Sequence, residues 1–105
     1  MSDEAPAGPA GDQPDDALSR DVEIVNKKGL HARASAKFCQ TAERFDAAIR
    51  VTRGSETVGG TSIMGLMMLG ASTGTKITVE ATGNEAAAAV DAIDKLVTSG
   101  FGEED

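Results

Sequence analysis

The residue best suited to chemistry is His31, the one histidine among 105 residues. It follows Gly29 and Leu30 and comes just before a stretch of helical periodicity that begins at Ala32. A helix N-terminus presents free backbone N–H groups and the positive end of the helix dipole, and both attract anions. A neutral imidazole is also a nucleophile near neutral pH. His31 is therefore a candidate phosphoryl acceptor, the alternative being a surface histidine that only begins a helix.

Basic residues accompany His31 in the sequence. Arg33 lies two positions further on, and Lys27, Lys28 and Lys37 are close by. A guanidinium group binds phosphate oxygens through paired hydrogen bonds, which makes Arg33 a candidate for assisting phosphoryl transfer. No metal or cofactor is expected, because His31 and Cys39 together supply too few ligands. Cys39 falls on the apolar face of its helix, which predicts a buried, inert thiol.

The second informative stretch begins at Ser62, a predicted helix N-cap, and continues as the apolar run 63–69. Leu66 and Leu69 are expected to point inward. Partial exposure is then expected for Ile63, Met64, Met67 and Met68. Exposed methionines form adaptable contact surfaces, although a helix buried more deeply in the core is the alternative. A phosphate on Ser62 would be tolerated by the helix dipole and would change the adjacent surface.

These residues must be positioned by seven elements. Strands are predicted at 22–26, 48–53, 56–59 and 76–82 from alternation and turn residues. Helices are predicted from Ala32, over 63–69, and between a cap at Asn84 and Gly100. The order βαββαβα predicts a two-layer α+β domain, with a four-stranded antiparallel sheet and the three helices on one face.

Composition places the domain between two acidic tails. Residues 1–20 hold all three prolines and five acids, which predicts a disordered N-terminal tail. The domain is expected over 21–100, with an acidic C-terminal tail at 101–105. Residues 21–102 hold nine acids and nine bases, so the net charge of −7 belongs to the tails. The single cysteine, with no signal-like or membrane-spanning segment, favours a cytoplasmic protein.

A nucleic-acid-binding module has a similar order of elements but fits poorly. Such domains stack bases on aromatic residues of their strands and carry a basic surface. The chain has three phenylalanines and no tyrosine or tryptophan. None of the three falls on a predicted strand, and the domain is neutral overall. We therefore expect neither nucleic-acid binding nor membrane insertion.

Two motifs resemble those of the HPr family, the histidine-containing phosphocarriers of the bacterial phosphoenolpyruvate-dependent phosphotransferase system. The sequence Gly29-Leu30-His31-Ala32-Arg33 is similar to the family's active-site signature. Residues 60–67 are similar to the signature around its regulatory serine. The resemblance covers residues 21 to 99 and implies an open-faced β-sandwich that acts as a monomer.

The resemblance also implies roles for individual residues. His31 corresponds to the histidine that enzyme I phosphorylates on Nδ1 and that a IIA-type acceptor dephosphorylates. Arg33 corresponds to the arginine that assists transfer. Ser62 corresponds to the serine modified by HPr kinase/phosphorylase. Leu30 and the exposed part of 63–68 (Ile63, Met64, Met67 and Met68) correspond to the apolar surface that docks enzyme I and IIA.

The sequence departs from the family pattern at two positions. Ala34 stands where the family usually has proline, and Thr61 stands where it often has lysine. The Ala34-Ser35 variant resembles the nitrogen-related or alphaproteobacterial branch of the family. The alternative function is a regulatory interaction module that is switched at Ser62 and carries no phosphoryl group on His31.

Overall fold

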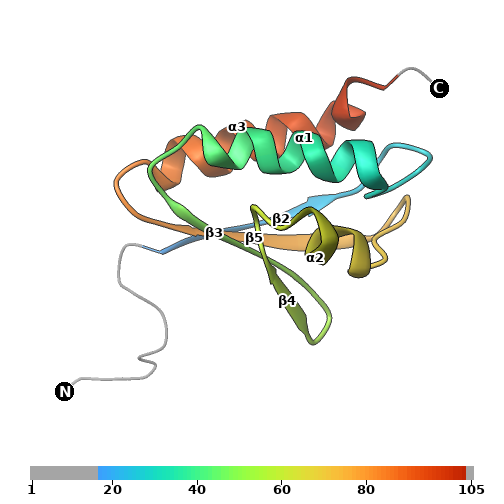
Figure 1. Ribbon diagram of the computed structural model, residues 1–105, viewed down its shortest axis with the longest axis horizontal. Coiled ribbons are helices and arrows are strands. Elements are labelled where there is room, and N and C mark those ends of the chain that lie inside the picture. Colours follow the sequence, from blue (N-terminus) through green and yellow to red (C-terminus); the bar gives the residue numbers. More distant parts are fainter. Residues whose placement is uncertain (1–16, 104–105) are drawn as a thin grey trace.

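A four-stranded antiparallel sheet organises the chain, and a computed structural model describes residues 17–103. The helices α1 and α3 lie side by side over one face of the sheet, and the short α2 contacts α1 and β4 (Figure 1). This arrangement confirms the predicted α+β fold with the order βαββαβα. The elements are β2 (Leu18–Glu23), α1 (Ala32–Glu43), β3 (Ala48–Arg53), β4 (Glu56–Gly59), α2 (Ile63–Met68), β5 (Lys76–Thr82), α3 (Ala86–Thr98) and the 3-10 turn η1 (Gly100–Gly102).

The strand order is β2-β5-β3-β4, so β5 lies inside the sheet and β2 and β4 form its edges. The strand β5 pairs antiparallel with both β2 and β3, with Val79 opposite Arg20 on one side and Val51 on the other. Every second side chain of β5 is buried, namely Ile77, Val79 and Ala81. Successive side chains of a strand point to opposite faces of the sheet, so these three share the face that the helices cover.

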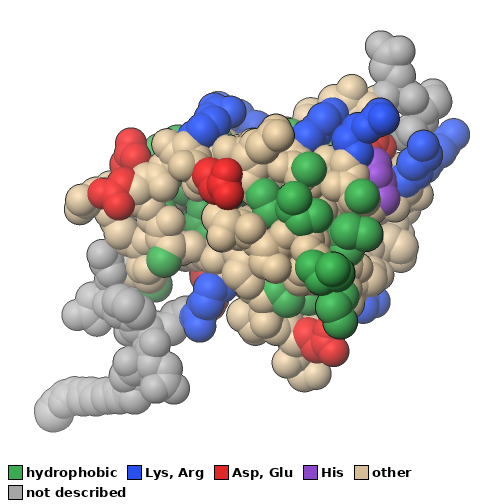
Figure 2. Space-filling model, in the orientation of Figure 1, with side chains coloured by type: hydrophobic (Ala, Val, Ile, Leu, Met, Phe, Trp, Pro, Cys, Tyr) green, Lys and Arg blue, Asp and Glu red, His purple; other side chains and the backbone are tan. Residues whose placement is uncertain are grey.

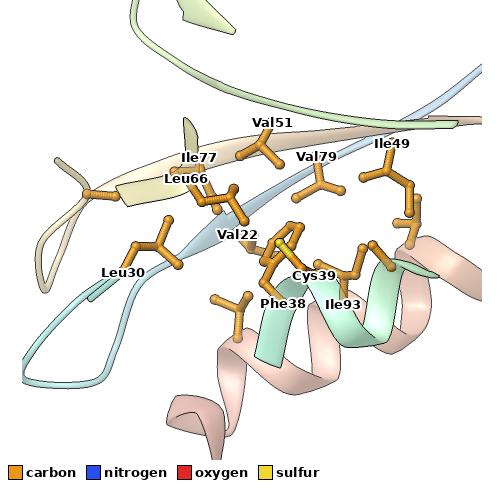
Figure 3. Packing of buried hydrophobic residues seen from close by; sticks show 14 of the residues in the cluster. Val22, Leu30, Phe38, Cys39, Ile49, Val51, Leu66, Ile77, Val79 and Ile93 are labelled. Atoms are coloured by element: carbon orange, nitrogen blue, oxygen red, sulfur yellow. The ribbon is translucent and has the colours of Figure 1, made fainter. Parts of the chain in front are cut away.

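The hydrophobic core lies between this sheet face and the helices (Figure 3). Phe38 of α1 and Ile93 of α3 are fully buried against Val51 and Val79 of the sheet layer. Leu66 of α2 belongs to the same cluster, so the short helix packs against the core of the domain. Because the core is small, each of these side chains contributes a sizeable share of the domain's stability.

The N-terminal boundary of the domain lies earlier than predicted. The composition of residues 1–20 predicts a disordered tail, but residues 18–20 form the first half of β2 and pair with residues 79–81 of β5. Arg20 also reaches α3, where it bonds Asp91 at 2.9 Å and Asp94 at 3.0 Å. These partners lie more than 55 residues away, so local composition could not reveal them. Residues 1–16 of the predicted tail lie outside the described residues.

The C-terminal boundary lies later than predicted. The sequence predicts an acidic tail at 101–105, but Phe101 is buried in the core, and Glu103 forms hydrogen bonds within the domain. The chain leaves α3 at Gly100, which has the positive φ expected of a glycine that ends a helix. Residues 104–105 lie outside the described residues.

The start of α3 also differs from its prediction. Glu85, not Asn84, occupies the N-cap position, and no side chain caps the helix there. The Asn84 amide donates instead to a carboxylate oxygen of Asp46 at 3.0 Å. Within residues 17–103, no helix is both long and apolar enough to cross a membrane.

Candidate functional site

The loop before α1 is fixed in place by Gly29 and Leu30. Gly29 has φ of +66°, and a Cβ there would lie 2.4 Å from the carbonyl oxygen of Ala71. The backbone N–H of Leu30 donates to that same oxygen at 3.0 Å. The Leu30 side chain is buried in the core, which corrects its expected place on a docking surface. Leu30 instead anchors the loop that presents His31.

His31 is the N-cap residue of α1, as its position in the sequence predicts. Its Nδ1 accepts a hydrogen bond from the backbone N–H of Arg33 at 3.2 Å. An atom that accepts an N–H carries a lone pair, so the proton of the neutral ring lies on Nε2. The first-turn amides have no acceptor within the helix. The lone pair of Nδ1 is thus presented where a helix favours anions.

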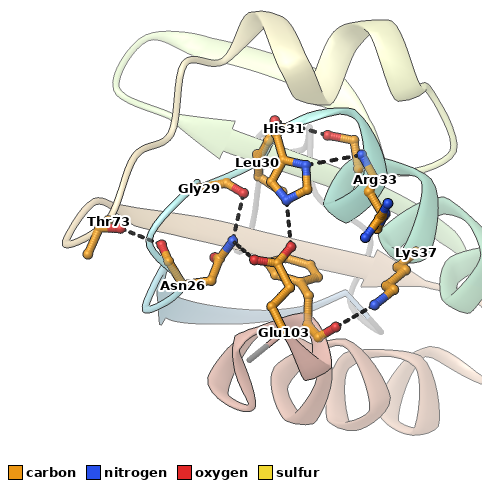
Figure 4. Close-up of polar contacts among 10 residues, drawn as sticks. Asn26, Gly29, Leu30, His31, Arg33, Lys37, Thr73 and Glu103 are labelled. Carbon is orange, nitrogen blue, oxygen red and sulfur yellow. Dashed lines mark hydrogen bonds and ion pairs between the residues drawn. The ribbon is translucent and has the colours of Figure 1, made fainter. Parts of the chain in front are cut away.

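The other ring nitrogen contacts Glu103. Glu103 Oε2 lies 2.5 Å from His31 Nε2 (Figure 4). Glu103 Oε1 accepts a hydrogen bond from the buried Asn26 side chain at 3.1 Å. The Asn26 amide also donates to the carbonyl oxygen of Gly29 at 2.9 Å, so it joins the histidine loop to the C-terminal segment.

The hydrogen bond from His31 lowers the pKa of Glu103, with smaller contributions from Asn26 and from the positive charge of Lys28. Burial opposes this shift, and the net pKa remains below the ordinary value for a glutamate. Glu103 is therefore ionised at neutral pH. The contact adds stability that is complete above the pKa of Glu103 in the unfolded chain and is lost as the pH falls through its folded value.

We expect this linkage to appear in pH-dependent unfolding. The wild-type chain should be more stable than a Glu103→Gln variant at pH 7, because the variant lacks the charged hydrogen-bond acceptor. The difference should shrink as the pH falls below the ordinary pKa of a glutamate and through the lowered pKa of Glu103 in the folded chain, because the carboxylate becomes protonated there. Denaturant unfolding at a series of pH values measures it, and a difference independent of pH would contradict the assigned contact.

An open depression of about 600 Å³ adjoins His31. Its lining includes three cations, Lys28, Arg33 and Lys37, with Glu103 as the one acidic side chain. Lys37 donates to the carbonyl oxygen of Phe101 at 2.7 Å, whereas the Arg33 guanidinium has no partner within residues 17–103. In Figure 2, Lys and Arg side chains lie beside the histidine. A phosphoryl group at Nδ1 would therefore meet positive charge and backbone donors.

The predictions for α2 agree with its geometry. Ser62 is the N-cap, and its Oγ accepts the backbone N–H of Gly65 at 3.0 Å. Leu66 and Leu69 are buried. The opposite surface carries a group that we call the methionine patch, with exposed fractions of 69% for Met64 and 72% for Met68, and of 43% and 42% for Ile63 and Met67. In Figure 2, hydrophobic side chains gather beside the histidine.

Sequence reasoning missed Glu103 and Asn26. Both contact the histidine loop, but Glu103 lies 72 positions from His31 along the chain. The available signal was Phe101, because a large aromatic residue between two glycines is poorly explained by a solvated tail.

Cys39 is buried as expected. Its thiol pKa is raised mainly by burial and to a smaller extent by the negative charge of Glu43. In the described part of the chain, no three His, Cys, Asp or Glu side chains are grouped to hold a metal ion.

Comparisons with known proteins agree with this geometry. A family model described as the PTS HPr component phosphorylation site matches residues 18–99. Phosphocarrier protein HPr of Neisseria meningitidis is 50% identical over 86 residues, covering 82% of this chain and 97% of that protein. Phosphocarrier protein NPr of Shewanella violacea is 44% identical over 86 residues, covering 82% of this chain and 94% of that protein.

Solved structures show the same fold. A crystal structure of HPr-C-His from Thermoanaerobacter tengcongensis aligns with a TM-score of 0.80 and 42% identity, covering 84% of this chain and 99% of that one. The fold, the site and these relatives define a phosphocarrier of the phosphotransferase system. The chain belongs to the HPr family.

Proposed function

We propose that this chain carries a phosphoryl group on Nδ1 of His31, taking it from enzyme I and passing it to a IIA-type acceptor in the cytoplasm. The observation that carries the proposal is the orientation of the imidazole. Nδ1 accepts the N–H of Arg33 while Nε2 faces Glu103, so the nucleophilic lone pair lies at the N-terminus of α1. The phosphocarrier family to which the chain belongs supplies the reaction class.

Phosphorylation of His31 exchanges the hydrogen-bond acceptor at the N-terminus of α1, from Nδ1 to the phosphoryl oxygens. The bond between Nδ1 and the Arg33 N–H is lost when Nδ1 bonds to phosphorus. The oxygens of the new group can then accept N–H donors of the first helical turn, and the helix dipole stabilises their charge. Ala34 adds a backbone N–H in this turn, where the family's usual proline has none. We therefore expect α1 to persist in the phosphorylated protein.

Arg33 is proposed to hold the transferring oxygens. We expect Arg33→Ala to slow phosphoryl transfer about tenfold in both directions, since a charge-assisted hydrogen bond in the transition state is lost. Arg33→Lys should recover part of the rate, because a lysine supplies charge without the paired donors. Rapid-quench measurement with enzyme I and with a IIA acceptor gives both rates.

Lys27→Ala is the matched control for Arg33, because it removes one positive charge that does not line the depression. It should leave both rates close to those of the wild type. Rates for Arg33→Ala equal to those of the control would remove Arg33 from the mechanism.

Docking and regulation are proposed for α2. The methionine patch supplies exposed, flexible apolar side chains of the kind that accommodate several partners. Ser62 caps the same helix, and HPr kinase/phosphorylase is proposed to modify it. A phosphate would be accepted by the helix dipole but would place roughly two negative charges beside the patch. Partner association, more than folding, is then the step that Ser62 controls.

Intact-mass analysis after incubation with phosphoenolpyruvate and enzyme I tests the proposed function. The expected product carries one phosphoryl group that acid treatment removes, because the bond joins phosphorus to nitrogen. An acid-stable phosphate formed only with HPr kinase/phosphorylase, and none with enzyme I, would instead support the regulatory module switched at Ser62.

A further inference from the structure

Glu103 is held in one orientation against His31. Both of its carboxylate oxygens are engaged, Oε2 with Nε2 of His31 at 2.5 Å and Oε1 with the Asn26 amide at 3.1 Å. The Glu103 side chain is only 13% exposed, and Asn26 is buried. A carboxylate fixed by two different partners differs from a surface acid that samples many rotamers, because its direction toward the ring is set by the fold.

The segment that carries Glu103 is anchored by a buried side chain and by a hydrogen bond to its backbone. Phe101 is 1% exposed in the core, and its carbonyl oxygen accepts a hydrogen bond from Lys37 at 2.7 Å. Gly100, Phe101 and Gly102 all have positive φ, and Phe101 is the one non-glycine residue with positive φ in the described chain. An L-residue adopts this conformation only where the surrounding structure holds it. The turn thus brings Glu103 back to the site after α3 has ended.

Glu103 also differs in charge from the rest of the site. The other charged side chains that line the depression are cations, namely Lys28, Arg33 and Lys37. Cations suit an incoming phosphoryl group, whereas an acid placed on the same side would repel it. Glu103 contacts Nε2, the nitrogen that does not receive the phosphoryl group. Its position therefore suits an interaction with the ring and not with the phosphate.

We propose that Glu103 is a positioning residue for phosphoryl transfer, which keeps the proton on Nε2 and stabilises the positive charge that the ring gains when Nδ1 attacks. This inference rests on the proposed function of His31. The carboxylate acts through the imidazole and does not contact the phosphoryl group. The arrangement follows the logic by which a buried carboxylate orients the histidine of a hydrolase.

The transfer step balances without any further reactant. The Nδ1 lone pair forms the new bond to phosphorus, and the bond from phosphorus to the donor breaks with its electron pair going to the donor. The proton stays on Nε2, so the ring becomes positively charged and faces the Glu103 carboxylate. Return of the phosphoryl group to an acceptor reverses these changes and restores the neutral ring.

The test compares Glu103→Gln with Glu56→Gln, which makes the same charge change at an exposed position of β4. In the ¹⁵N-labelled wild type, we expect a downfield proton resonance from Nε2–H of His31. That resonance should move upfield in Glu103→Gln and stay unchanged in Glu56→Gln. Transfer from enzyme I should be about tenfold slower in Glu103→Gln alone. Glu103→Asp keeps the charge and should recover part of the rate.

The outcomes separate this inference from the function on which it rests. A wild-type chain that takes no phosphoryl group from enzyme I would overturn the proposed function itself. A phosphorylated wild type that lacks the downfield resonance would overturn the positioning role alone. The role would also be overturned if the resonance moved as expected while Glu103→Gln transferred as fast as the control.

Discussion

Replacing His31 with asparagine will abolish acid-labile phosphorylation while the domain stays folded. Asparagine is among the best N-cap residues, so its side-chain oxygen can take over the hydrogen bond that Nδ1 accepts from the Arg33 N–H. It has no nitrogen lone pair with the nucleophilicity of imidazole. The variant therefore removes the reacting atom and keeps the capping hydrogen bond, although it loses the contact between Nε2 and Glu103. Intact mass after incubation with phosphoenolpyruvate and enzyme I measures the loss.

His31→Ala provides the comparison for this experiment. It should lose phosphorylation equally but also lose the cap, at a cost of about 1 kcal/mol in the free energy of unfolding. Thermal melts of the two variants separate the two roles of the residue. Phosphate retained at wild-type level on a folded His31→Asn protein would show that another residue is the acceptor.

Substituting the methionine patch should weaken binding to enzyme I by at least tenfold. Met64→Glu and Met68→Glu each place a charge on the most exposed part of the patch, where docking must remove water. Both side chains point outward, so the free energy of unfolding should change little. Calorimetric titration of enzyme I with each variant gives the dissociation constants.

Leu18→Glu is the control, because Leu18 is also an exposed hydrophobic residue, at 40%, and lies on β2, the edge strand remote from β4 and α2. It should bind like the wild type. Equal affinities for the patch variants and the control would mean that α2 is not the docking surface.

Ser62→Asp tests regulation at the same surface. Aspartate caps helices well, so the melting temperature should hold while affinity for enzyme I falls. A lower melting temperature with unchanged affinity would assign Ser62 a structural role only.

The elements that could be predicted are those whose signals are local. Residues 48–53, 56–59 and 76–82 carry strand alternation and turn residues within their own spans, and the structure places β3, β4 and β5 there. The cap at Ser62 and the inward side of α2 likewise depend on residues at most seven positions apart. Local patterning predicts such features because the period of the element fixes which side chains share a face.

Both ends of the domain were predicted wrongly for one physical reason. Leu18–Glu23 is a strand because its backbone pairs with β5, and Arg20 meets two carboxylates of α3. Glu103 is ordered because Phe101 fills the core ahead of it. In each case the partner is distant in sequence, so composition near the terminus predicts solvation where tertiary contacts provide order.

The candidate site also contains residues that local sequence predicts and residues that only distant contacts place. His31 and Arg33 are found from the sequence because a helix start and its first turn are local features. The burial of Leu30 depends on the loop around Ala71, which accepts its N–H from 41 positions away. The contact between His31 and Glu103 depends on the C-terminal turn. The sequence therefore predicts the phosphoryl acceptor His31 and the neighbouring cation Arg33, but not the groups that orient the imidazole ring.

The identity of the phosphorylated atom decides whether His31 is the phosphoryl acceptor. Phosphorus and nitrogen NMR of the ¹⁵N-labelled chain, after incubation with phosphoenolpyruvate and enzyme I, reports which nitrogen is bonded to phosphorus. We predict a single acid-labile phosphorus resonance coupled to Nδ1 of His31, with Nε2 free of phosphorus. Coupling to Nε2, or a phosphate on another residue, would show that Nδ1 of His31 is not the phosphoryl acceptor.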